Sequence, residues 1–204
     1  MDRPLFFPDP RFGWIFYTVL IAFTLLGAYL DLRKAVLPKK LTLSLLGLGI
    51  GFNVVRGAWL ASLGSKLSWL PTGNLWLGAL DGLLFSLIGC ASTAALFFVF
   101  WIVKLCGGGD VKLFAALGAW IGFWHVLFIM LAANVVGAIL LLGRLLTSGW
   151  KPLAARRDKR GMTYALPVAI SAGILLLWFY RFDLNLAARS KADPVPLPTE
   201  VRYE

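Results

Sequence analysis

The chain contains six stretches that lack Asp, Glu, Lys and Arg, and these stretches supply the apolar material for helices. They are residues 12–30, 41–55, 67–80, 82–103, 113–143 and 161–180. An apolar helix needs about 20 residues to cross the hydrocarbon layer. The long stretch is divided because Gly118, Gly122 and the cluster at 123–125 indicate a break. We therefore predict an all-α polytopic integral membrane protein with about six transmembrane helices, at 14–31, 41–60, 75–103, 110–123, 125–146 and 162–180.

Composition supports this class. Of the 204 residues, 59% are hydrophobic and 15% are charged, whereas charged residues make up about 25% of soluble domains. Six spans use roughly 120 residues, which leaves no room for a separate soluble domain. A secreted protein, a nucleic-acid factor and a cytosolic enzyme are therefore disfavoured. We expect one membrane-embedded domain over residues 1–180 and a polar, Pro-containing C-terminal tail over 181–204.

The net charge of +10 is interpreted as a topology signal, because short cytoplasmic loops of membrane proteins accumulate Lys and Arg. The basic residues flank or fill the first, third and fifth predicted loops: Arg33, Lys34, Lys39 and Lys40; Lys104 and Lys112; and Lys151, Arg156, Arg157, Lys159 and Arg160. These loops should face the cytoplasm and both termini the outside. Membrane lipid, and not nucleic acid, is the expected partner of this charge.

Metal-ligating residue types are scarce. Cys90 and Cys106 do not form a metal-ligand pair spacing, and His125 is the single histidine. We therefore expect no metal and no cofactor.

Three aspartates lie at the ends of predicted spans, where carboxylates are costly and are functional candidates. Asp31 closes the first span and Asp110 opens the fourth, so counting the spans places both on the same membrane face. Asp81, near the start of the third span, falls toward the opposite face. Asp81 and Asn134 are predicted to make interhelical polar contacts.

Two aspartates that meet at a membrane boundary can act as an acid/base pair without a metal. Like charges about 3 Å apart cannot both ionise, so they share one proton. One carboxylate then activates water while the other protonates the peptide group. The alternative is that each Asp only caps a helix or pairs with a nearby cation. Gly107, Gly108 and Gly109 before Asp110 favour a site, because they leave room and conformational freedom for an approaching substrate backbone.

These segments together resemble the type IV prepilin peptidases of the GxGD family of membrane aspartic proteases. The GxGD signature matches residues 107–110, and Val111-Lys112-Leu113 continues it. The first catalytic segment of the family resembles Asp31-Leu32, Leu37-Pro38 and Leu41-Thr42. The last helix of the family resembles Tyr164-Ala165-Leu166-Pro167 with Gly173. The resemblance implies that Asp31 and Asp110 are catalytic. It also implies that Gly107, Gly108 and Gly109 line the approach to Asp110, and that Tyr164 and Pro167 position the substrate.

The resemblance further implies removal of the leader peptide from prepilin or pseudopilin precursors at the bacterial inner (cytoplasmic) membrane, in pilus biogenesis and protein secretion. Larger members carry a four-cysteine insert between the first two spans, associated with N-methylation. Here that loop is only about 32–40 and has no Cys, so we expect no methyltransferase activity. The short form resembles the peptidases of tight-adherence (Flp) pilus systems, and archaeal preflagellin peptidases are also compact. Lys39 stands where the family often has Asn.

Other interpretations remain open. Lys112 either favours an ionised carboxylate at Asp110 or extends to lipid headgroups, and we also count it among the substrate-binding candidates. A small proton- or ion-coupled transporter is the main rival, because intramembrane carboxylates also mark ion paths. Transporter sites, however, lie at the midplane between repeated halves, and this chain shows no internal repeat. A purely structural assembly component is a third alternative.

Overall fold

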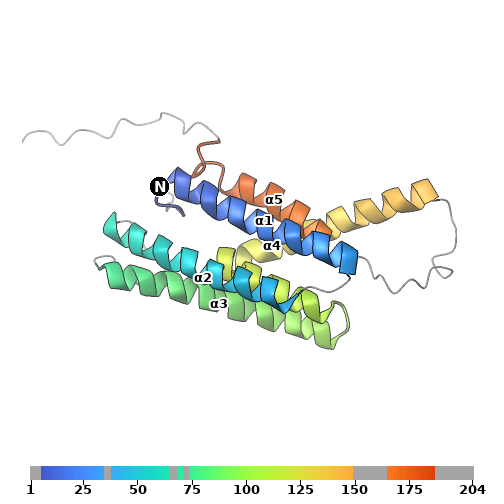
Figure 1. Ribbon diagram of the computed structural model, residues 1–204, viewed down its shortest axis with the longest axis horizontal. Coiled ribbons are helices and arrows are strands. Elements are labelled where there is room, and N and C mark those ends of the chain that lie inside the picture. Colours follow the sequence, from blue (N-terminus) through green and yellow to red (C-terminus); the bar gives the residue numbers. More distant parts are fainter. Residues whose placement is uncertain (1–5, 35–37, 65–68, 71–73, 149–164, 187–204) are drawn as a thin grey trace, which may run out of the picture.

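The computed structural model describes residues 6–34, 38–64, 69–70, 74–148 and 165–186. Within these ranges the chain forms helices and connecting turns and no strand, which confirms the all-α prediction (Figure 1). The helices are α1 (Pro10–Lys34), α2 (Lys39–Ser62), α3 (Leu75–Ile102), α4 (Gly108–Ser148) and α5 (Ala165–Phe179).

Four helices, α1 to α4, are long and apolar enough to cross a membrane, and α5 is a shorter apolar helix. The protein is therefore a multi-pass membrane protein by helix length and composition. The predicted division of the long apolar stretch is confirmed, because α4 is interrupted at Gly122. The number of six crossings stays a prediction.

Gly122 breaks α4 with a positive φ of 77° and a ψ of 168°. A Cβ at this position would lie 2.9 Å from the ring of Phe85, so both the backbone conformation and the space require glycine. The two segments of α4 extend from this break toward the same end of the molecule (Figure 1). The chain therefore turns back inside the helical bundle.

The carbonyl groups released by this break are satisfied by side chains. Asn53 Nδ2 donates to the carbonyls of residues 119 and 120 at 2.8 and 3.0 Å, and Ser86 Oγ donates to that of residue 119 at 2.8 Å. His125 Nδ1 lies 2.9 Å from the carbonyl of residue 121, so this nitrogen carries the proton. Such partners are needed because unpaired backbone groups are costly away from water.

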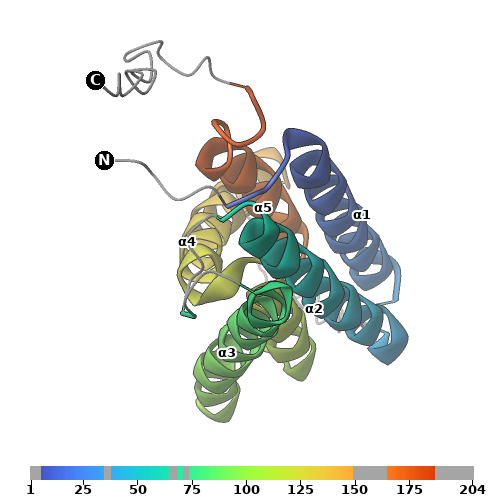
Figure 2. The ribbon, with the colours of Figure 1, turned by 90° about the vertical axis from the view of Figure 1, so that its left-hand side faces the viewer.

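Small residues let α2, α3 and α4 pack closely. A Cβ at Gly57 would meet the Gly78 carbonyl, and one at Gly118 would meet Thr93, so the backbones approach at the distance that only glycine permits. Figure 2 shows α2 and α3 side by side, with α1 standing apart from them. Helix α1 instead packs mainly against α5. Trp120 fills the space between α4 and α2, where its Nε1 donates to the Leu45 carbonyl at 2.6 Å.

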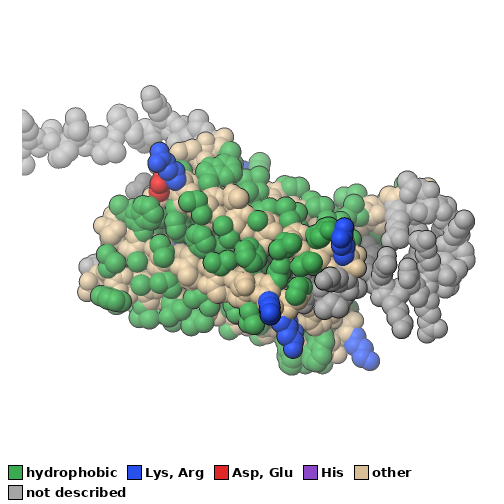
Figure 3. Space-filling view, viewed as in Figure 1, with side chains coloured by type: hydrophobic (Ala, Val, Ile, Leu, Met, Phe, Trp, Pro, Cys, Tyr) green, Lys and Arg blue, Asp and Glu red, His purple; other side chains and the backbone are tan. Residues whose placement is uncertain are grey.

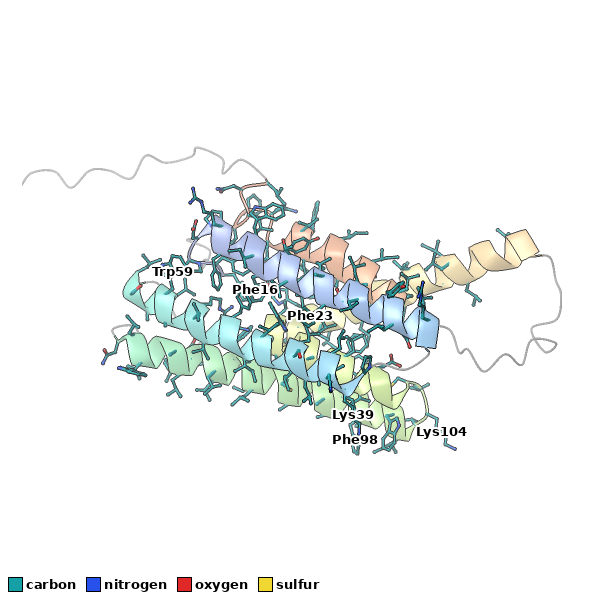
Figure 4. The ribbon with its side chains drawn as sticks, viewed as in Figure 1. Phe16, Phe23, Lys39, Trp59, Phe98 and Lys104 are labelled. Atoms are coloured by element: carbon teal, nitrogen blue, oxygen red, sulfur yellow. The ribbon has the colours of Figure 1, made fainter. Side chains whose placement is uncertain are left out.

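The two ends of the bundle differ in charge. Lys and Arg side chains gather where α1 ends and α2 begins, the basic side chains at the opposite end lie beside an acidic one, and the body of the molecule is mostly apolar on the face shown in Figure 3. Lys39 and Lys104 lie at this end and Trp59 lies toward the other (Figure 4). We call the end at which α1 and α3 finish and α2, α4 and α5 start the basic end.

Two further predictions have different outcomes. The interhelical contact predicted for Asn134 is wrong, because this exposed side chain donates to the Met130 carbonyl of its own helix at 2.9 Å. The reason is that an amide can satisfy itself on the carbonyl one turn earlier. Of the predicted tail, only residues 181–186 are described, and Leu184 among them is buried against α1. The predicted domain boundary stays untested.

Candidate active site

Asp31 lies in the last turn of α1, at the basic end, and its side chain is partly buried. Its carboxylate interacts with the backbone N–H of Ala165, the first residue of α5. The first N–H groups of a helix have no partner within the helix and favour a negative charge. The end of α1 is thereby placed against the start of α5.

Asp110 lies in the first turn of α4 and is also partly buried. Its Oδ2 accepts a hydrogen bond from the Gly107 N–H at 3.0 Å, and its own N–H donates to the Gly107 carbonyl at 3.0 Å. A side chain in the third helical position that reaches back to the preceding cap is a capping arrangement. The helix-capping role considered from the sequence is therefore present, and it fixes the position of the Asp110 carboxylate.

The two carboxylates come from different helices and interact electrostatically with each other. Asp31 and Asp110 thus lie at the same end of the bundle, as counting the spans predicts. Two negative charges in this position repel each other, and the repulsion is relieved when one of the two groups is protonated. The site can therefore hold one carboxyl and one carboxylate together, which is the arrangement that acid/base chemistry requires.

Asp81 is excluded from this site by its position and by its partners. It is 2% exposed, and its Oδ1 accepts the backbone N–H groups of Trp69 and Leu70 at 2.7 and 3.2 Å. It also interacts electrostatically with Arg56 of α2, which is 3% exposed. Asp81 therefore joins α3 to α2 and to the connection between them, as predicted.

Comparison with known proteins places these residues in a family. The sequence model described as "Type IV leader peptidase family" matches residues 18–142, which is more than half of the chain and includes both Asp31 and Asp110. The protein belongs to the type IV leader peptidase family. No solved structure matches it.

Three relatives show how far the similarity to this leader peptidase family extends. The prepilin leader peptidase/N-methyltransferases of Aeromonas salmonicida (strain A449) and Aeromonas hydrophila are each 32% identical over 166 residues, covering 78% of this chain and 46% and 47% of their own lengths. The enzyme of the same description from Xanthomonas campestris pv. campestris is 31% identical over 175 residues, covering 82% and 52%. The chain spans about half the length of the curated relatives it matches.

The glycines of the leader peptidase signature do not use the backbone freedom expected of them. None of residues 107–109 has a positive φ, and Gly108 and Gly109 begin the regular helix α4. A Cβ at Gly107 would lie 3.3 Å from Asp110 Oδ2, and one at Gly108 would lie 3.7 Å from Trp101 Nε1. The glycines are therefore explained by the room that they leave beside Asp110, and not by an unusual backbone conformation.

Cys106 belongs to the surroundings of Asp110, and sequence reasoning set it aside as a possible metal ligand only. Its Sγ donates to the Phe97 carbonyl at 3.5 Å. Burial raises the pKa of the Cys106 thiol, and the nearby negative charge of Asp110 raises it further. Its place next to the glycine triplet was the signal that could have identified it.

The remaining predicted site residues are placed differently. Lys112 is exposed, on the side of α4 that faces α2. Pro167 is buried in the first turn of α5, where proline is tolerated, and lies near Gly137 of α4. Tyr164 lies outside the described residues. Among the described residues, no three His, Cys, Asp or Glu side chains gather closely enough to hold a metal ion.

Proposed function

We propose that this protein is a membrane aspartic endopeptidase that removes the leader peptide of prepilin or pseudopilin precursors at the cytoplasmic boundary of the bacterial inner membrane. The observation that carries the proposal is the electrostatic interaction between Asp31 and Asp110 at one end of the bundle. The pair comes from α1 and α4, and both residues fall inside the family match, as does Asp81. The names of the relatives supply the class of substrate.

The proposed reaction uses the pair as base and acid. The ionised carboxylate takes a proton from a water molecule, and the water oxygen bonds to the carbonyl carbon of the scissile peptide. The protonated carboxyl gives its proton to the carbonyl oxygen. The carbon–nitrogen bond then breaks as the nitrogen gains the proton held by the first carboxylate, and a hydroxyl of the intermediate returns a proton to the second carboxylate. Gly107 fixes Asp110, and the Ala165 N–H orients Asp31.

Replacement of each aspartate by asparagine tests the proposal. Asn keeps the size of the side chain and a carbonyl oxygen that can cap α4, but it cannot exchange a proton. Co-expression of Asp31→Asn or Asp110→Asn with a candidate precursor, followed by the size of the precursor on a gel, should show cleavage reduced by about 10²–10⁴-fold. Asp81→Asn is the matched control and should still cleave in proportion to the amount of folded protein. Undiminished cleavage by either of the first two variants contradicts the assignment.

Only the peptidase activity is proposed. The relatives' names include N-methyltransferase, but this chain lacks the cysteine-containing insert associated with that activity and has nine residues, 32–40, in its place. Among the described residues no observation favours the ion-coupled transporter considered from the sequence. The expected product therefore has a free, unmethylated N-terminus, which mass spectrometry of the processed precursor would show.

A further inference from the structure

A pocket of about 260 Å³ lies at the basic end, between the first turns of α2 and α4. It is lined by Lys39, Thr42, Leu43 and Leu46 of α2 and by Lys112, Ala115 and Ala116 of α4. Both lysines are exposed and contribute positive charge to its rim. No acidic side chain is among the described residues that line it.

The backbone adds to the positive character of the pocket. Helix α2 begins at Lys39, and its N-cap residue, Pro38, provides no side-chain hydrogen bond to the first turn. Thr42 Oγ1 is a donor to the Lys39 carbonyl at 3.1 Å and so does not itself cap the first turn of α2. The N-terminus of α2 together with two ammonium groups favours a bound anion.

The inner part of the same pocket is apolar. Leu43 and Leu46 lie on one side and Ala115 and Ala116 on the other. Leu43 is 65% exposed, on a helix that spans the membrane by length and composition, so the lining continues onto a surface that faces lipid. A ligand that matches this pocket has an anionic head and an apolar chain.

We propose that this pocket binds one anionic phospholipid, with its phosphate between Lys39 and Lys112 and the start of an acyl chain along Leu43 and Leu46. Basic pockets between transmembrane helices on the cytoplasmic side bind acidic headgroups in this way. The lipid joins the start of α2 to the second and third turns of α4. Because Asp110 lies two residues before Lys112 on α4, the lipid steadies the helix that carries this carboxylate.

The geometry of α4 separates this pocket from the aspartate pair. Two residues correspond to about 200° around an α-helix, so Lys112 and Asp110 extend from nearly opposite sides of α4. Lys112 faces α2, whereas Asp110 interacts with Asp31. A peptide held at the two carboxylates therefore does not fill the pocket. For this reason we favour a lipid over an acidic side chain of the substrate, and the binding assay is independent of the proposed peptidase function.

The test uses the purified full-length protein in nanodiscs of phosphatidylcholine that contain one-fifth phosphatidylglycerol. Native mass spectrometry measures the phosphatidylglycerol that stays bound. The pocket variant carries Lys39→Gln with Lys112→Gln. The control variant carries Lys40→Gln with Lys104→Gln, which removes the same charge from the same end outside the pocket. We expect the wild type and the control to retain one phosphatidylglycerol, and the pocket variant to retain at least fivefold less.

A third variant separates loss of binding from loss of folding. Ala115→Leu fills the pocket and keeps both lysines, so it should also lose the phosphatidylglycerol while its thermal unfolding stays close to that of the wild type. Equal retention by the pocket and control variants would overturn the proposal. The measurement can be repeated in Asp110→Asn protein, so its outcome does not depend on peptide cleavage.

Discussion

The acidic residues at the two ends of the bundle have opposite surroundings. Asp81, at the end away from the lysines, is buried and is matched by two backbone N–H groups and by the charge of Arg56. Asp31 and Asp110, at the basic end, are partly exposed, each interacts with one backbone N–H, and the negative charge of Asp31 acts on Asp110. A satisfied buried charge holds helices together, whereas a repelling pair at a boundary keeps proton-transfer capacity available.

The largest effect on stability is expected from removing Arg56, the charged partner of Asp81. Arg56 lies 4.0 Å from the ring centroid of Phe6 and 4.5 Å from that of Phe85, and it faces Asp81. Arg56→Ala leaves a buried carboxylate without this charge and should lower the free energy of unfolding by about 3–5 kcal/mol. Thermal unfolding in detergent measures this loss. Arg33→Ala, which removes an exposed cation stacked on Tyr29, is the control and should cost less than about 1 kcal/mol. Equal losses would show that the two ends do not differ.

Neutralising one carboxylate should change the free energy of unfolding differently at the two ends of the bundle. Asp81→Asn weakens the acceptor of two buried N–H groups and should lower the free energy of unfolding by about 1–3 kcal/mol. Asp31→Asn removes a repulsion and should leave stability unchanged or raise it by less than about 1 kcal/mol, although it abolishes the proposed cleavage. The same unfolding assay compares both variants. A loss for Asp31→Asn as large as that for Asp81→Asn would indicate that Asp31 is structural.

Whether a substrate needs the space beside Gly108 can be tested without changing the stability of the protein. Gly108 begins α4 and its neighbourhood accepts a methyl group, so Gly108→Ala should not destabilise the protein, because Ala has the higher helix propensity. If a substrate backbone must pass this position, cleavage should fall about tenfold, which corresponds to about 1.4 kcal/mol of transition-state stabilisation. Initial rates with a purified precursor measure this. Gly143→Ala, at a site with open space, is the control. Unchanged rates for both variants would remove the glycine from the proposed substrate path.

The smallest effect reports on the charge of Asp110. This carboxylate raises the pKa of the Cys106 thiol, and the thiolate is the form that reacts with maleimides. Asp110→Asn should lower that pKa, increase the thiolate fraction at pH 7 and speed the labelling of Cys106 by roughly two- to fivefold. The experiment uses a Cys90→Ser background and follows the labelled mass with time. Asp81→Asn should leave the rate unchanged, and an unchanged rate in Asp110→Asn would place its charge away from the thiol.

The sequence predicted the features that depend on local pattern. Apolar stretches placed the helices, and the glycine and aromatic cluster placed the break between residues 123 and 125, next to Gly122, where the structure has it. Counting spans brought Asp31 and Asp110 to one end and sent Asp81 to the other. The sequence did not reveal that Asn53 and Ser86 donate hydrogen bonds to carbonyls of another helix, because such partners are determined by how the helices pack. Lys39 and Lys112 belong to different helices for the same reason, and their shared pocket becomes visible only in the assembled bundle.

The break at Gly122 also affects how the polypeptide enters the bilayer. Residues 108–121 form a helix about 21 Å long, and the hydrocarbon layer is about 30 Å thick. This segment is shorter than a typical crossing. We therefore expect it to enter the bilayer together with the segment that follows it. We also expect α2 and α3, whose Asn53 and Ser86 donate to carbonyls at the turn, to be in the bilayer before it.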